Sequence, residues 1–230
     1  MSRVVVALNF GQAAPTATLF AETIAAALQH EARTLTVGPG IADDVVQIAD
    51  LPDELERIDA SMLIVEIADT RQINTCLQAC RTLRIPYLLV RPNQKPVFAS
   101  VAVPVTFLPE DKEKAPFAAA FGRFFGAKLT IFKPKDYGTR AIKNIDAMTT
   151  LFKSFDLEYD IVQARKGSDG VEREAARWAQ TQADLVIVSA SREYGLDDIL
   201  FGSKELRIAK HCTVPLLLIN PRGDLYALCD

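Results

Sequence analysis

The sequence predicts an α/β protein whose sheets are mostly parallel, built as two copies of one plan. Its apolar segments are continuous runs rather than alternating patterns, and stretches of helical length separate them. Such runs are typical of strands that are covered on both faces, as in parallel sheets with helices on each side. The plan also repeats, because residues 60–92 and 183–221 each contain an apolar strand, a helix and a second apolar strand between prolines. We therefore expect two related domains.

Eight apolar runs mark the expected strands in chain order. They are VVVAL (4–8), MLIVEI (62–67), YLLV (87–90), VAVPV (101–105), LTIF (129–132), YDIV (159–162), LVIV (185–188) and PLLLI (215–219). Helices are expected between them, since apolar side chains recur at the spacing that gives a helix one buried face. Three such stripes are expected in the core: Phe117, Phe121, Phe124 and Phe125; Ala141, Ile145, Met148 and Phe152; and Val171, Ala175, Trp178 and Ala179.

The expected domains are residues 1–96 and 97–230, with Lys95-Pro96 as the linker. The second copy has room for five strands and four helices. The first copy is shorter, because the segment between Val37 and Met62 holds a Gly-Pro-Gly turn and an acidic stretch where a helix and a strand should be reduced. It is also shorter between the repeated strand and its helix, at the place where α/β folds usually bind ligands.

Composition narrows the classes of function. A formal net charge of −3 argues against a nucleic-acid partner. No apolar run reaches the roughly 18 residues that span a bilayer, so no membrane partner is expected. The four cysteines lack a framework spacing, which favours a reducing, cytoplasmic location, and Cys76 and Cys80 are expected as a buried pair of thiols rather than a metal site.

Catalytic chemistry is not expected. The two histidines, His30 and His211, fall near the ends of expected helices, where a structural or solvated role is the common one. The sequence has no nucleophile elbow, no P-loop and no cluster of metal-ligating residues. We therefore predict no catalytic residue, no metal and no enzyme, although a weak ATPase stays open.

The second copy resembles a universal stress protein domain. The segments that carry the resemblance are VAVPVTF (101–107), FGAKLTIF (125–132), ADLVIVSASREYGLDDILFGS (183–203) and the run from Ser203 to Pro221. The first copy resembles the same family only at its ends. The whole chain is thus similar to tandem universal stress proteins: two copies of a Rossmann-like parallel-sheet fold, the first of them shortened.

The resemblance implies where a nucleotide would bind in the second domain. In nucleotide-binding members an Asp follows the first strand, and a glycine-rich loop after the fourth strand surrounds the phosphates. Here Thr106 stands at the Asp position, and Ser189 and Arg192 replace two of the loop glycines. Side chains at these positions obstruct the approach of backbone amides to phosphate. The candidate cofactor-binding residues are Pro104, Val105, Thr106, Ser189, Arg192, Gly202, Ser203 and Lys204.

Two interpretations of these loop residues stay open. The helix that begins at Lys204 could accept an anion at its N-terminal amides, with Arg192 offsetting the lost backbone contacts. Alternatively, Ser203 simply caps that helix and Gly202 makes the turn. In the first copy Asn9 stands at the adenosine-side position, but the loop at residues 68–71 is too short to surround a triphosphate, so no nucleotide is expected there.

We therefore expect a universal stress protein with a non-catalytic stress-response or scaffold role, an eroded nucleotide-binding loop and an unidentified protein partner. Its domains should pair through their last strands, YLLV and PLLLI, and the chain should form a homodimer. No cofactor is expected. The alternative is an adenine-nucleotide switch or weak ATPase that binds ATP or AMP in the second domain. A third possibility is another small molecule in a polar pocket between Thr106 and Gly202.

Overall fold

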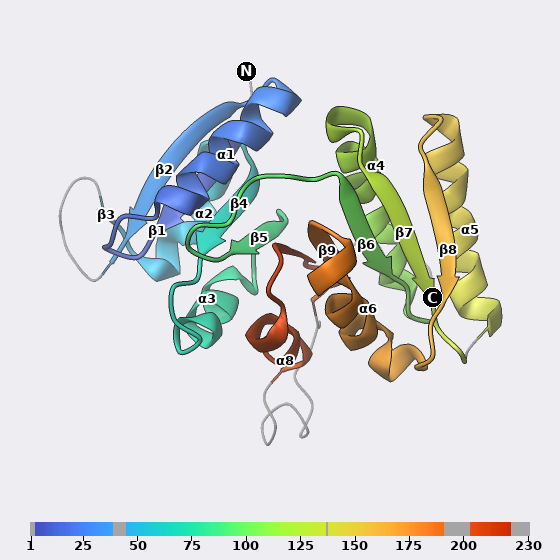
Figure 1. Ribbon diagram of the computed structural model, residues 1–230. Helices are drawn as coiled ribbons and strands as arrows, with labels where there is room; N and C mark the ends of the chain where they lie inside the picture. Colours follow the sequence, from blue (N-terminus) through green and yellow to red (C-terminus); the bar gives the residue numbers. More distant parts are fainter. Residues whose placement is uncertain (1–2, 39–44, 137, 191–202, 222–230) are drawn as a thin grey trace. The chain divides into compact units, whose positions relative to one another are not determined.

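The computed structural model describes residues 3–38, 45–136, 138–190 and 203–221 (Figure 1). The chain divides into two compact units, Met1–Pro96 and Val97–Asp230. Both are layered α/β structures, so the predicted fold class is confirmed. Among the described residues, every helix is too short or too polar to cross a bilayer.

The first unit holds one parallel sheet with the strand order β3-β2-β1-β4-β5. Its elements are β1 (Val4–Asn9), α1 (Pro15–Leu28), β2 (Glu31–Val37), β3 (Val45–Val46), the 3-10 helix η1 (Ile48–Asp50), α2 (Leu51–Arg57), β4 (Ala60–Glu66), α3 (Gln72–Cys80) and β5 (Tyr87–Val90).

The second unit holds a parallel sheet with the order β10-β9-β6-β7-β8. Its elements are β6 (Ser100–Pro104), the 3-10 helix η2 (Pro109–Glu113), α4 (Lys114–Phe125), β7 (Lys128–Lys133), α5 (Gly138–Ser154), β8 (Tyr159–Gln163), α6 (Ser168–Gln182), β9 (Leu185–Ser189), α8 (Lys204–His211) and β10 (Leu216–Ile219).

The strand order of each unit reverses direction once. In the second unit the chain runs outward from β6 through β7 to β8, then returns to β9 on the other side of β6. Right-handed crossovers place the helices of the outward and return paths on opposite faces of the sheet. Accordingly α4 packs beside α5, and α6 packs beside α8. The first unit reverses in the same way between β1 and β4. These two reversals are the switch points of the units.

The central strands are buried because nearly every residue in them is apolar, whereas β2 and β8, which lie farther from the centres of the sheets, are mostly exposed. In β1 and β9, for example, Val5, Val6, Leu185 and Ile187 are inaccessible to solvent. The stripe Ala141, Ile145, Met148 and Phe152 is buried as predicted, and so are Val171, Ala175 and Ala179.

The phenylalanine stripe of α4 was predicted to lie in the core throughout, and this is wrong for Phe124, which is 46% exposed. The buried face of α4 is made by its alanines together with Phe121. Phe121 and Phe125 pack against Phe98, with ring centroids 4.9 and 4.8 Å apart. Phe124 instead lies outside this face, where the guanidinium of Arg123 covers its ring at 5.2 Å.

The first unit is shorter where the sequence predicts a reduction. β2 ends at Val37 and the two-residue β3 begins at Val45, whereas in the second unit the 17-residue helix α5 lies between β7 and β8. The acidic stretch forms η1 and the short helix α2, which buries Leu51 and Leu55. The first unit therefore keeps the strand order with a smaller outer layer.

Candidate functional site

Ligands of open α/β sheets bind at the carboxyl ends of the strands, at the switch point. In the second unit this place lies beyond Pro104 at the end of β6 and Ser189 at the end of β9. Both residues are buried.

A buried ion pair lies at the switch point of the second unit. The Lys114 ammonium is 2.9 Å from the Asp111 carboxylate, and the two side chains are 0% and 1% exposed. Asp111 belongs to η2, and Lys114 is the first residue of α4. The 3-10 turn that leads into α4 thus brings both charges back beneath the end of β6.

The polar groups of the two strand ends bind this pair. Asp111 accepts hydrogen bonds from the backbone amide of Thr106 and, at 2.8 Å, from the hydroxyl of Ser189. Lys114 donates to the carbonyl of Pro104. The carboxylate therefore has three donors from three separate segments, which is the kind of compensation that a buried charge requires.

The loop that follows β6 is fixed from a second side. The Asn144 side chain on α5 donates to the carbonyls of Thr106 and Leu108, at 3.1 and 2.8 Å. The Thr106 hydroxyl accepts the amide of Leu108 at 3.2 Å. The backbone amide of Val105 donates to the Phe132 carbonyl on the neighbouring strand. Hydrogen bonds with α5 and with the neighbouring strand therefore fix the backbone of this loop.

The ion pair holds Asp111 in its charged form. Burial would raise the pKa of the carboxyl, but the charge of Lys114 and the hydrogen bonds from Thr106 and Ser189 together keep that pKa below its ordinary value. The charged carboxylate of Asp111, paired with the Lys114 ammonium, therefore occupies the switch point of the second unit.

Ser203 and Lys204 lie beside this network at the start of α8. The Ser203 hydroxyl accepts the amide of Leu206 at 3.2 Å, so Ser203 caps the helix. Lys204 forms an ion pair with Glu172 of α6 at 2.9 Å. Burial would lower the pKa of Lys204, but Glu172, Glu205 and Asp111 together raise it, so this side chain stays protonated.

The switch point of the first unit is also filled by a carboxylate. Glu66, the last residue of β4, accepts the backbone amides of Thr16 and Ala17 at 2.8 and 3.2 Å. These amides belong to the first turn of α1, whose N-cap residue, Ala14, gives no side-chain hydrogen bond. Helix N-termini attract anions, and here the chain supplies its own. Asn9 lies at the end of β1 with its amide oxygen buried.

The structure brings together six of the eight predicted site residues: Pro104, Val105, Thr106, Ser189, Ser203 and Lys204. Arg192 and Gly202 lie outside the described residues. The third possibility, another small molecule in a polar pocket, needs open space at Thr106 and Ser189. Both instead bind Asp111 and are only 4% and 3% exposed.

Sequence reasoning missed Asp111, Lys114 and Glu66. Asp111 and Lys114 belong to the charged run PEDKEK, which reads as a solvated loop. Glu66 is more recognisable, because it ends an otherwise apolar strand, where a carboxylate must find donors. A charged residue at the last position of a buried parallel strand is therefore the pattern that could have revealed it.

The remaining candidates for chemistry are occupied or inert. The Ser61 hydroxyl gives its hydrogen to the Val4 carbonyl, so His30 donates through Nδ1 to Ser61 at 3.0 Å. This bond lies where β1 and β4 begin, at the opposite end of the sheet from the switch point. Cys76 and Cys80 are both buried on α3, as expected, and burial raises the pKa of Cys76 to about 12.

Comparison with known proteins adds the fold relationship. No family model matches the sequence, and no curated protein sequence matches it significantly. Among solved structures, a candidate universal stress protein from Pseudomonas aeruginosa UCBPP-PA14 has a TM-score of 0.68 at 15% sequence identity, with 98% of this chain and 95% of that chain covered.

Two further solved structures are similar. A protein of unknown function from Pseudomonas aeruginosa PAO1 has a TM-score of 0.67 at 14% identity, with 98% and 95% of the two chains covered. A universal stress protein from Archaeoglobus fulgidus DSM 4304 has a TM-score of 0.62 at 11% identity, with 96% and 87% covered. The chain thus has the α/β fold, with parallel strands and helices on both faces, that universal stress proteins have.

Proposed function

We propose that this chain is a tandem universal stress protein with a non-catalytic scaffold role in a stress response, the first domain being a shortened copy of the second. One observation carries the proposal: the carboxylates of Asp111 and Glu66 occupy the anion positions of the two switch points. A phosphate that approached either place would find the hydrogen-bond donors already bound to a carboxylate of the chain itself.

The energetic cost of admitting a nucleotide supports this view. Separating a buried ion pair costs about 3 to 5 kcal/mol. A nucleotide that had to displace the Asp111 carboxylate from Lys114 would lose roughly two to four orders of magnitude in affinity. In this proposal the second domain therefore binds a protein partner and does not catalyse a reaction.

We also propose that the two domains pair through their last strands and that the chain forms a homodimer in the cytoplasm. Each last strand lies at an edge of its unit's sheet: β5 pairs with β4, and β10 pairs with β9. The buried thiols of Cys76, Cys80 and Cys212 suit a reducing compartment. Oxidising a Leu89→Cys, Leu217→Cys double variant should cross-link the two strands within one chain. Cross-links exclusively between chains would contradict internal pairing.

The deciding experiment is a titration with Mg-ATP, AMP and cyclic AMP. Calorimetry measures binding, and thermal unfolding measures stabilisation. The titration compares the natural chain with Gly202→Arg, which places a long side chain at the position that the resemblance assigns to phosphate. Both proteins should respond alike, because the switch point takes no nucleotide. A stabilisation at sub-millimolar ligand that Gly202→Arg abolishes would overturn the proposal.

The second candidate is a nucleotide-dependent switch or weak ATPase in the second domain, using ATP or AMP. One observation favours it: Lys204 stays protonated at the N-terminus of α8, where Glu172, Glu205 and Asp111 raise its pKa. In this view phosphate would replace the Glu172 carboxylate on Lys204. The response described above, lost in Gly202→Arg, is the result that would support it.

A further inference from the structure

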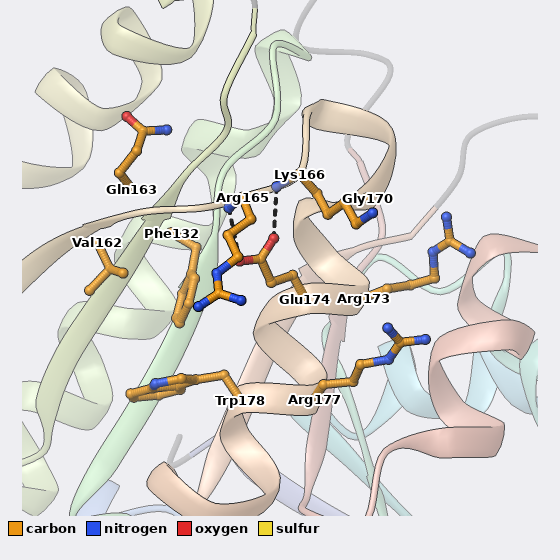
Figure 2. A pocket seen from close by; sticks show the side chains of 10 residues that line it. All are labelled: Phe132, Val162, Gln163, Arg165, Lys166, Gly170, Arg173, Glu174, Arg177 and Trp178. Atoms are coloured by element: carbon orange, nitrogen blue, oxygen red, sulfur yellow. Dashed lines mark hydrogen bonds between the residues drawn. The ribbon is translucent and has the colours of Figure 1, made fainter.

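A hollow lies on the second unit, and neither Asp111, Lys114 nor Ser189 of the switch point lines it. It has a volume of about 820 Å³ and lies between α6 and the carboxyl ends of β7 and β8 (Figure 2). This volume is within the range of sites that bind small molecules, roughly 300 to 1,000 Å³. Its lining combines two features that are seldom found together by chance, an aromatic pair and a group of cations.

The aromatic part is made by Phe132 at the end of β7 and Trp178 on α6. Their ring centroids are 5.1 Å apart with an interplanar angle of 66°. Phe132 is buried, whereas Trp178 is partly exposed to the hollow. Figure 2 shows the guanidinium of Arg165 pointing toward these two rings. An exposed indole beside a guanidinium offers a flat surface on which a planar group can stack.

The cationic part comes from two adjacent segments. Arg165 and Lys166 lie on the loop that enters α6, and Arg173 and Arg177 lie one turn apart on the helix. In Figure 2 both helical arginines extend from the side of α6 away from Trp178, so the hollow runs from the aromatic pair to these cations. Four cations and one carboxylate thus line the hollow of a chain whose net charge is −3. Within the described parts of the chain, none of these four side chains forms an ion pair.

The single carboxylate of the lining, Glu174, has a structural task. Its two oxygens accept the backbone amides of Arg165 and Lys166, at 2.9 and 2.8 Å. Glu174 therefore fixes the loop that presents the first two cations, and its hydrogen-bonding capacity is directed to the backbone. The guanidinium groups keep their donors for another anion.

We propose that this hollow binds a small organic phosphate, with its planar group against Trp178 and its phosphates among the arginines. Guanidinium groups match phosphate in charge and in bidentate geometry, and several of them around one hollow favour a ligand with more than one negative charge. The aromatic pair can contact the planar group of an organic phosphate, and inorganic phosphate has no such group. This site is independent of the switch point and of the scaffold role.

The test uses Trp178, the only tryptophan of the chain, as its reporter. ATP with EDTA, inorganic tripolyphosphate and adenosine are titrated against the full chain. ATP should quench the indole fluorescence saturably, tripolyphosphate should compete with it, and adenosine should need a much higher concentration. The quenching should persist in Gly202→Arg, which separates this site from a nucleotide at the switch point.

The variant Arg173→Glu, Arg177→Glu should weaken the ATP response by about tenfold or more. Arg140→Glu is the matched control, since Arg140 is an exposed arginine of α5 in the same unit and outside the hollow. It should bind like the natural chain. All of these positions are on the surface, and circular dichroism checks that each variant is folded. Absence of saturable quenching, or equal affinity in the double variant, overturns the proposal.

Discussion

The Lys114 ammonium and the Asp111 carboxylate are 2.9 Å apart and neither is in contact with solvent, in a place where the fold would normally hold a ligand. The pair is local in sequence but joins distant parts of the unit, because Asp111 also binds Ser189 at the end of β9. It therefore connects the two strands that flank the switch point.

Removing one partner of the ion pair should be strongly destabilising. Asp111→Ala leaves the Lys114 ammonium buried with no counter-charge, and we expect the free energy of unfolding to fall by about 3 to 5 kcal/mol. Urea unfolding followed by circular dichroism measures the change.

Replacing both partners should restore most of that loss. In Asp111→Leu, Lys114→Met the buried charges give way to apolar side chains of similar size, an exchange that is often neutral. A double variant as unstable as Asp111→Ala would show that the polar contacts to Thr106 and Ser189, rather than the charge balance, hold this region together.

The acid stability of the protein should depend on Asp111. Because the pKa of Asp111 in the folded chain lies below its ordinary value of 3.8, the unfolded chain binds the proton more readily, and acid favours unfolding. The stabilisation is present above the ordinary value and disappears as the pH falls through the folded pKa. The free energy of unfolding, measured with denaturant at a series of acidic pH values, should fall less steeply with decreasing pH in the apolar double variant than in the natural chain.

Glu66 should stabilise the first unit by capping α1. Glu66→Ala leaves the amides of Thr16 and Ala17 without their acceptor, at a cost of about 1 to 2 kcal/mol. Glu66→Gln keeps an oxygen acceptor and loses only the charge, so it should be less destabilising. Equal unfolding midpoints for the two variants would mean that the contact is electrostatic and not a hydrogen bond.

The described cysteines should resist thiol reagents. Burial raises the pKa of Cys76 to about 12 and also raises the pKa of Cys80 well above its ordinary value, so neither is a thiolate near neutral pH. In a Cys229→Ser variant, Ellman's reagent should react slowly under native conditions and with three thiols after denaturation. Rapid native labelling would show that α3 opens readily.

The fold could be predicted from the sequence to a large extent, for a physical reason. A strand covered on both faces must be apolar at nearly every position, so VVVAL and LVIV are legible without any tertiary information. The helix spacing of Ala141 and Phe152 is legible for the same reason. Phe124 shows the limit, because periodicity finds a stripe but not its rotation relative to the core. The buried face of α4 is made mainly by alanines, and Phe124 lies outside it.

The site was harder to predict because its chemistry depends on residues that come together from different elements. Thr106 and Ser189 could be placed at strand ends from the sequence alone. Their partner Asp111 could not, because its burial follows from the turn of η2 beneath β6 and not from its neighbours in sequence. The carboxylate at the end of β4 follows the same logic in the first unit. The missing loop glycines can be read directly from the sequence. The carboxylates that occupy the switch points instead can be identified only in the structure.

The capping of α1 by Glu66 has a consequence for the behaviour of the protein in a cell. A domain whose helix terminus waits for phosphate gains stability when that ligand is abundant and loses it on starvation. Here the counter-charge is covalently part of the chain, so its local concentration never changes. The stability of the first unit should therefore not depend on how much nucleotide or phosphate the cell contains.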